Sequence, residues 1–500
     1  MPPPRGDRAR RHPVAGDEPR RDHGTRAAPA ARLARPGLKR EGRVVGLDLK
    51  IVGGLVVTDG VSEVRDVGIE GPSIAEIGPA GSVGPAREEV DATGRYVLPG
   101  VVDAHFHCRA PSHPERGDFA SETRAAAVGG VTTIFEMPIS DPACSTPEVF
   151  RARRRLAESQ CLVDFALYAG GAVRNEAHAA TMAELGAIAF KLFTHAPPPD
   201  RIHEFEGLWA TDEASIYQAL EALAPTGLVC TVHAENESLL RLFSSLPAVD
   251  HVPPRPPVIE ATAIAMVGAI AGAVGARVHV AHLTSIEALD ALRGARTAGA
   301  VITAETCPQY LVLDDTEIIR LGAFAKVAPP LRPARHQQAL WHGLLDGTLS
   351  IVASDHAPFL PHEKESVDYA LAPQGIPAVE TMLPIMLDAS ARGVIPLERA
   401  VELVTSAPAQ LFGVYPRKGS LSVGADADIV LFAPEEVWEP GVQSLVSRAA
   451  GCGRVYEGIR LRGKVERTIA GGRTVFRDDV IADGAGGRFI APAGVAAEHV

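Results

Sequence analysis

The stretch VLPGVVDAHFH (residues 97–107) combines an apolar, β-branched run with two histidines that are one residue apart. Side chains alternate across a β-strand, so His105 and His107 are predicted to lie on one face of a strand. Four later apolar runs each carry, at or just past their end, one polar side chain of a type that can bind metal or take part in catalysis. These runs are GAIAFKLF with Lys191, LVCTVHAE with His233, RVHVAHLTS with His282 and LSIVASDHAP with Asp355.

Helical stretches lie between these runs, so strands and helices alternate along most of the chain. Such alternation predicts an α/β fold with a parallel sheet covered by helices. In a (β/α)₈ barrel of the TIM type, the strands deliver their polar side chains to one mouth, at their carboxyl ends. We therefore predict a barrel over residues 98–418 in which the six side chains converge.

The segments on either side of the predicted barrel have a different sequence pattern. Residues 46–97 and 419–483 consist of short alternating runs separated by Gly and Asp turns, which is typical of antiparallel β-structure. Two long, Pro-rich loops inside the barrel segment carry aromatic residues: 195–210 follows the lysine strand and 356–378 follows the aspartate strand. We expect both loops to face the substrate, because barrels build their specificity contacts from such loops.

The six side chains match the ligand preferences of borderline-soft metal ions. Four imidazoles, one carboxylate and one lysine suit two divalent cations, most simply Zn²⁺. The ammonium of Lys191 would repel a metal, so this residue fits only if CO₂ has carboxylated it to an anionic carbamate. Each residue alone has an ordinary explanation, such as a hydrogen-bonded core histidine or a helix-capping aspartate. Their occurrence in series, each near a strand end, favours the metal site.

At this level the chain resembles the amidohydrolase superfamily, and within it the cyclic amidohydrolases: dihydroorotase, allantoinase, hydantoinase and dihydropyrimidinase. The resemblance covers roughly residues 46 to 480. Its landmarks occur here in the family's order, as LPGVVDAHFHCR, TRAAAVGGVTTIFEMP, FKLF, VHAEN, AHLTS, AETCPQY, APPLR, ASDHAP, KGSLSVGADADIVLF and LRGKVERTIAGGRTVF.

The resemblance implies a role for each candidate residue. His105, His107, Lys191 and Asp355 would hold one metal ion, and Lys191, His233 and His282 the other. Asp355 would also be the catalytic residue, which takes a proton from the attacking hydroxide and delivers it to the leaving nitrogen. The product would be an N-carbamoyl or ureido acid. The resemblance further implies a small β-sandwich built from residues 46–97 and 419–483, and a homo-oligomer, either a dimer or a tetramer.

The substrate-binding candidates are Arg109, Ile139 and Phe359. Arg109 lies two residues past His107, so on a continuing strand it would point the same way as the two histidines, into the mouth of the barrel. Arg109 stands where dihydroorotases grip a carboxylate, but Ile139 and Phe359 replace two polar contacts of that subfamily. An apolar corner favours an allantoin- or hydantoin-type ring, with dihydroorotase as the alternative. Arg109 could instead pair with a loop acid such as Glu115 or Asp118. Hydantoinases place a tyrosine a few residues after the carboxylated lysine, and here Thr194 or His195 would have to substitute for it.

A different class of function is a catalytically inactive, dihydroorotase-like structural or regulatory partner, since some relatives have lost their metal ligands. All six ligand positions are intact here, which favours an enzyme, a hydrolase of C–N bonds in cyclic amides.

Composition bounds the remaining possibilities. Residues 1–44 are Arg-, Pro- and Ala-rich with a net charge of +7 and are predicted to form a disordered basic extension, while the remainder carries −19. The acidic body argues against nucleic-acid binding. No apolar run is long enough to span a membrane. Six scattered cysteines without a CxxC pair favour a reducing cytoplasm.

Overall fold

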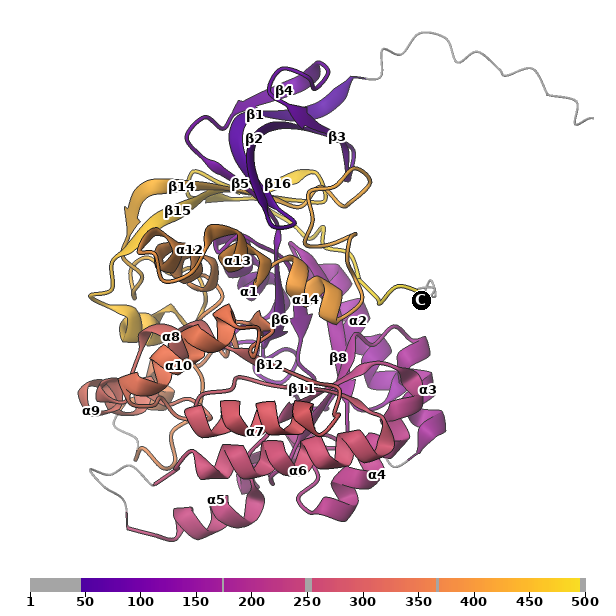
Figure 1. Ribbon diagram of the computed structural model, residues 1–500, viewed down its shortest axis with the longest axis vertical. Helices are drawn as coiled ribbons and strands as arrows, with labels where there is room; N and C mark the ends of the chain where they lie inside the picture. The colour runs from indigo at the N-terminus through magenta and orange to yellow at the C-terminus, as the bar shows by residue number, and fades with distance from the viewer. Residues whose placement is uncertain (1–45, 173–174, 248–253, 366–367, 495–500) are drawn as a thin grey trace, which may run out of the picture. The chain divides into compact units, whose positions relative to one another are not determined.

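The computed structural model describes residues 46–172, 175–247, 254–365 and 368–494 (Figure 1). The chain divides into two units, Met1–Val45 and Gly46–Val500, and only the second contains described residues. The predicted basic extension, residues 1–44, lies outside the described residues. Of the described helices, none is long and apolar enough to cross a membrane.

Eight parallel strands, in sequential order, form the central sheet of the second unit. They are β6 (Val101–Phe106), β7 (Val131–Glu136), β8 (Asp164–Gly170), β9 (Ala189–Phe193), β10 (Val229–His233), β11 (Arg277–Val280), β12 (Ile302–Thr306) and β13 (Ile351–Val352). A parallel bridge between Phe106 and His356, with the His107 amide donating to the His356 carbonyl at 2.9 Å, connects the segment after β13 to β6. The predicted barrel is confirmed.

Helices separate and cover the strands, as the alternating pattern predicts (Figure 1). The longer ones are α1 (Phe119–Val128), α2 (Pro147–Gln160), α3 (Glu176–Glu184), α4 (Glu213–Leu223), α5 (Glu237–Ser244), α6 (Val258–Val274), α7 (Ile286–Thr297), α10 (Ala334–Leu345) and α12 (Met382–Ala391). Local sequence explains where several begin. Asp118 and Asp212 each form a capping box with a serine three residues later, and Thr146 caps α2.

Shorter helical segments shape the loops around the barrel. They are the 3₁₀ segments η1 (Pro199–Phe205), η2 (Ala224–Thr226), η3 (Gly322–Ala325) and η4 (Ala450–Tyr456) and the α-helices α8 (Pro308–Val312), α9 (Thr316–Leu321), α11 (Pro361–Lys364), α13 (Leu397–Glu402) and α14 (Ser406–Leu411). Two of them, η1 and α11, lie in the loops predicted to face the substrate.

A second sheet of nine strands joins the two terminal segments. It contains β1 (Leu47–Thr58), β2 (Val61–Glu70), β3 (Ser73–Pro79), β4 (Ala86–Asp91), β5 (Tyr96–Pro99), β14 (Ile429–Trp438), β15 (Leu461–Ala470), β16 (Arg473–Arg477) and β17 (Val480–Ile481). The antiparallel pair β5–β14 makes the connection, and Ile51, Val97 and Ile429 belong to the sheet's own apolar core.

The prediction for residues 46–97 was wrong in one respect. β1 pairs in parallel with both β4 and β5, so this sheet is mixed rather than purely antiparallel. Alternating polarity shows that a segment is a strand with one buried face, but it carries no information on the direction of the partner strand. That 46–97 and 419–483 make up a β-sandwich domain of their own stays a prediction.

A buried ion cluster links the second sheet to the barrel. Lys418, 1% exposed, donates to Asp164 at the start of β8 at 2.5 Å and to Asp428, just before β14, at 2.6 Å, and pairs with Asp426 at 2.9 Å. The three carboxylates lie close enough together to hold a metal ion, but the ammonium of Lys418 occupies the position between them. We therefore interpret this group as structural.

Replacing Lys418 by methionine should lower the free energy of unfolding by about 3–5 kcal/mol, because the change leaves the buried Asp428 without an ion-pair partner among the described residues, whereas Asp164 and Asp426 keep Arg488. Urea-induced unfolding measures the loss. The matched control is Lys464→Met, which removes an ammonium paired with the exposed Asp479 and should cost at most about 1 kcal/mol. Equal effects of the two substitutions would contradict the assignment of Lys418 as the ion that holds the junction together.

Candidate active site

The six predicted side chains line one cavity of about 950 Å³ at the carboxyl end of the barrel. His105 lies on β6 and His107 one residue after it, His233 is the last residue of β10, and His282 and Asp355 follow β11 and β13. Lys191 differs from the prediction, because it is the third of the five residues of β9 rather than its end. Its long side chain still lines the cavity.

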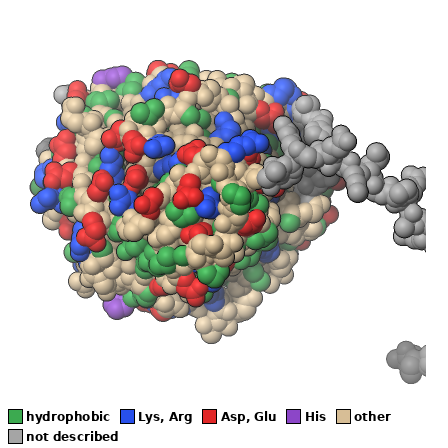
Figure 2. Space-filling view, turned by 90° about the horizontal axis from the view of Figure 1, so that it is seen from above, with side chains coloured by type: hydrophobic (Ala, Val, Ile, Leu, Met, Phe, Trp, Pro, Cys, Tyr) green, Lys and Arg blue, Asp and Glu red, His purple; other side chains and the backbone are tan. Residues whose placement is uncertain are grey.

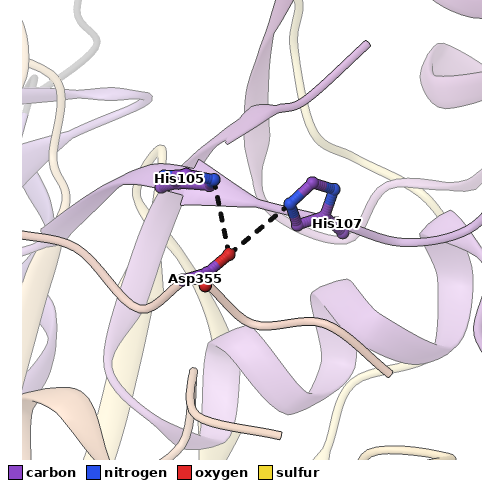
Figure 3. A group of neighbouring side chains, drawn as sticks. All are labelled: His105, His107 and Asp355. Carbon is purple, nitrogen blue, oxygen red and sulfur yellow. Dashed lines mark ion pairs between the residues drawn. The ribbon is translucent and has the colours of Figure 1, made fainter. Parts of the chain in front are cut away.

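Short distances connect the centre of this group. Asp355 Oδ1 lies 3.3 Å from His105 Nε2 and 3.6 Å from His107 Nε2 (Figure 3). Lys191 Nζ lies 3.5 Å from His105 Nε2. The ring centroids of His105 and His282 are 5.4 Å apart, and those of His233 and His282 are 4.5 Å apart. All six side chains therefore converge on a volume that would accommodate two ions.

The backbone is strained around this cavity. Among the described residues, six that are not glycine have positive φ, and three of them are Arg109 (+60°), His282 (+39°) and Asp355 (+47°). Such conformations cost about 1–3 kcal/mol each and persist where the surrounding structure fixes them, commonly at functional sites. They also explain how His282 and Asp355, which lie past the ends of their strands, turn back into the cavity.

Three of the four imidazoles, those of His107, His233 and His282, are suited to bind metal because burial disfavours their charged form. Burial and neighbouring cations hold the pKa of His107 and of His282 well below the usual range, and burial lowers the pKa of His233 to about 3. Burial also lowers the pKa of the Lys191 ammonium to about 8 and raises the pKa of Asp355. The Nδ1 atoms of His107 and His282 are buried without a hydrogen-bond partner. Neutral imidazoles with free nitrogens fit a divalent cation.

Two glutamates that the sequence did not identify orient these ligands. Glu305 on β12 accepts from His105 Nδ1 at 2.5 Å and from His279 Nε2 at 3.1 Å, which directs His105 Nε2 toward Asp355. Glu235 lies 2.7 Å from His233 Nε2 and is held by Arg255, which leaves Nδ1 as the nitrogen of His233 available to a metal. The motifs HAE and AETCP contain both glutamates, but nothing in their spacing distinguishes them from ordinary buried acids.

The structure distinguishes between Thr194 and His195, the two residues that could replace the tyrosine of hydantoinases. The Thr194 hydroxyl donates to the backbone carbonyls of His233 and Glu235 at 3.1 and 2.8 Å, so it is used in packing. His195 instead lines the cavity, with its ring centroid 4.8 Å from that of His233. Of the two, His195 is the one that can reach a substrate.

Arg109 lines the cavity, although the reason first expected was wrong. β6 ends at Phe106, so Arg109 does not lie on a continuing strand, and its positive φ brings it to the cavity. Its guanidinium lies 4.5 Å from the centroid of the Phe359 ring, and its buried Nε has no hydrogen-bond partner. Burial, reinforced by Arg201 and Arg116, lowers its pKa to about 9.

The predicted surroundings of Arg109 also need correction. Glu115 pairs with His113 at 3.2 Å and Asp118 with Arg448 at 3.0 Å, so neither loop acid neutralises Arg109. The Phe359 ring is in contact with a guanidinium and is not a free apolar wall. Only Ile139 behaves as expected: it packs with Phe193 and Phe205 in a small apolar cluster that borders the cavity.

A parallel barrel with histidines, an aspartate and a lysine gathered at the carboxyl ends of its strands is an arrangement typical of barrel hydrolases. A sequence model of the amidohydrolase family matches residues 96–475. The chain belongs to the amidohydrolase family, whose members generally bind divalent metal ions.

Individual relatives agree with this assignment. The chain is 37% identical to an allantoinase of Rubrobacter xylanophilus over 89% of its own length and 98% of the relative's. It is 33% identical to a D-hydantoinase of Rhizobium radiobacter over 86% and 95% of the two chains. The solved L-hydantoinase (dihydropyrimidinase) of Arthrobacter aurescens superposes with a TM-score of 0.84 at 30% identity, over 89% of this chain and all of that one. The predicted class, a hydrolase of cyclic amides, is confirmed.

Proposed function

We propose that the protein opens the ring of a cyclic ureide of the allantoin or hydantoin type to give an N-carbamoyl or ureido acid. The observation that carries this proposal is the convergence of all six candidate ligands with Arg109 in one cavity. The relatives named allantoinase and hydantoinase support the ring class.

His105, His107 and Asp355 would hold one divalent cation and His233 and His282 a second, both most simply zinc, and Lys191 would contribute to both as a carbamate. Two observations support this assignment: the short distances among His105, His107 and Asp355, and the neutral state of the buried imidazoles. When bound, the two cations would supply Lewis acidity, which lowers the pKa of a water molecule and polarises a carbonyl group.

The chain's own residues would then move the proton and hold the ring. Asp355 is the proposed catalytic residue: its Oδ1 accepts the proton of the attacking water and returns it to the leaving ring nitrogen. Arg109, desolvated and with a free Nε, donates to a carbonyl oxygen of the ring. Ile139 contributes an apolar contact to the lining of the cavity, and Phe359 supports the guanidinium.

Dihydroorotase remains the second candidate, because one observation favours it. Arg109 is a buried cation without a carboxylate partner among the described residues, and a substrate carboxylate would neutralise it. The deciding experiment compares kcat/KM for allantoin, hydantoin, dihydrouracil and dihydroorotate with the metal-loaded enzyme. The proposal requires allantoin or hydantoin to be the best of the four, and a clear preference for dihydroorotate would replace it.

Replacing Arg109 by methionine should lower kcat/KM for the best ring by about 10- to 100-fold, since hydrogen bonds from charged groups are worth about 1.5–3 kcal/mol. The matched control is Arg116→Met. The Arg116 guanidinium also lies over Phe359, but it is paired with Glu363 at 2.7 Å and should matter less to the ring. If Arg116→Met proves as damaging as Arg109→Met, Arg109 has no special role in binding.

We further propose a cytoplasmic homo-oligomer that binds neither nucleic acid nor membrane. The six cysteines are free and buried, which agrees with a reducing compartment. Acidic and basic side chains are interspersed on the face shown in Figure 2. Light scattering of the purified protein would test the dimer or tetramer expected from the resemblance.

A further inference from the structure

A second cavity, of about 680 Å³, adjoins the substrate cavity, and we call it the annex. It lies among α5, α9, residues 326–336 and Tyr369, with α5 and α9 at the lower left of Figure 1. The two cavities share the lining residues Leu240, Arg255, Lys326, Ala370 and Gln374. A ligand in the substrate cavity therefore has the annex as its immediate neighbour.

The boundary between the two cavities is held in place by hydrogen bonds. Lys326 Nζ donates to the carbonyls of Tyr369, Ala370 and Ala372 at 2.6, 3.0 and 2.7 Å. Arg255 is fixed from behind by Glu235. Lys326 and Arg255, which line both cavities, are therefore each held in place by hydrogen bonds.

The annex has apolar walls, and its lining residues carry a net positive charge. Leu240, Phe243 and Ile318 supply the apolar surface. Four lining residues carry a permanent or near-permanent positive charge, and the only acid among the lining residues is Asp315. The four are Arg255, Lys326, Arg332 and Arg335.

Two of these cations lack a counter-ion. Arg255 is paired with Glu235, and Arg332 lies 4.0 Å from Glu260. Lys326 and Arg335 form no ion pair with any residue in the described ranges. In addition, His336 Nε2 and Arg332 Nη2 are buried and form no hydrogen bond, although Arg332 Nη2 is the atom that lies 4.0 Å from Glu260. His336 is 1% exposed and Arg332 is 7% exposed. Buried donors without partners are costly, which indicates that an acceptor belongs there.

We propose that the annex receives the exocyclic substituent of the ring substrate, and that the substituent it prefers is an apolar chain that ends in a carboxylate. This inference rests on the proposed ring-opening function and specifies its substrate class. The ring occupies the metal cavity, the chain crosses the boundary at Leu240 and Ala370, and the carboxylate reaches Arg335 and the free donors of Arg332 and His336.

Substituted hydantoins test the preference. The metal-loaded wild-type enzyme is assayed with hydantoins that carry a methyl, a pentyl, a carbamoylbutyl or a carboxybutyl group. We expect kcat/KM to be highest for the carboxybutyl compound, by about tenfold over the methyl compound. If the pentyl or carbamoylbutyl compound is as good as the carboxybutyl compound, or if the methyl compound is the best, the inference is wrong. The proposed function stands in those cases; it fails if no hydantoin ring is opened or if dihydroorotate is the preferred substrate.

Two neighbouring serines provide a matched pair of variants. Ser244 lines the annex and Ser245 does not, while both are exposed and each hydroxyl donates to a backbone carbonyl three residues earlier. Ser244→Trp should lower the ratio of kcat/KM for carboxybutyl- over methylhydantoin by about tenfold through filling the annex. Ser245→Trp should leave that ratio within about twofold. Equal ratios in the two variants would overturn the proposal.

A charge variant separates the carboxylate from the chain and does not depend on a bulky substitution. Arg335→Gln should reduce the preference for carboxybutyl over carbamoylbutyl by about fivefold, a value suited to a partly exposed ion pair. The control is Arg320→Gln on α9, whose guanidinium pairs with Glu317 and does not line the annex. If the preference for the carboxybutyl over the carbamoylbutyl compound is unchanged in Arg335→Gln, the annex does not recognise the negative charge of the carboxylate.

Discussion

Asp355→Asn is expected to lower kcat by about 10²- to 10⁴-fold, the range that general acid–base catalysis contributes. Asp355 Oδ1 lies 3.3 Å from His105 Nε2 and 3.6 Å from His107 Nε2, and the positive φ of Asp355 directs it there. The amide of asparagine retains an oxygen that can contact a cation, but it cannot accept and return a proton. The loss should therefore appear in kcat, with the melting temperature preserved.

Metal content measured on the same preparations separates the two roles of Asp355. If Asp355→Asn keeps its metal and loses turnover, the proton transfer accounts for the effect; if both fall together, metal binding contributes. Glu363→Gln serves as the control, because this carboxylate lines the same cavity but pairs with Arg116. Near-normal turnover of Asp355→Asn would remove the residue from the mechanism.

The sequence predicted most of this centre because barrel geometry turns position along the chain into position in space. Once His105 and His107 are placed on one strand by alternation, any polar residue that closes a parallel neighbour must reach the same mouth. His233, His282 and Asp355 satisfy this rule. The helix starts at Asp118 and Asp212 were predictable as well, since a cap depends only on residues within the same turn.

What the sequence could not predict depends on contacts between distant segments. Glu305 fixes the His105 ring across 200 residues of chain, and no local pattern encodes that hydrogen bond. Phe359 was read as apolar surface because residue type alone does not show that the Arg109 guanidinium lies on its ring. The direction of Arg109 was derived from a strand that in fact ends at Phe106. In each case a tertiary contact or a turn overrode a correct local expectation.

The largest loss of metal is expected for Lys191→Ala. Lys191 is 1% exposed, and its Nζ lies 3.5 Å from His105 Nε2. An ammonium buried among imidazoles is unfavourable, whereas a carbamate at this position would be an anion between two cations. Without it, the two candidate ion positions lose their common negative ligand, and alanine cannot replace it.

The wild-type protein, produced with zinc and bicarbonate, should contain close to two divalent ions per chain and carry the extra mass of one CO₂. Lys191→Ala should lose most of the metal, the extra mass and at least about 10²-fold in kcat, as expected when a catalytic group is removed. The control is Lys326→Met: this ammonium also has its pKa lowered to about 8 by burial and lines the same cavity, but it is bonded to three carbonyls. That variant should keep both ions and the extra mass. A wild-type enzyme that binds one ion or none under these conditions, or a Lys191→Ala variant that binds two, would rule out the carbamate, because the arrangement of charges around Lys191 then has no need of it.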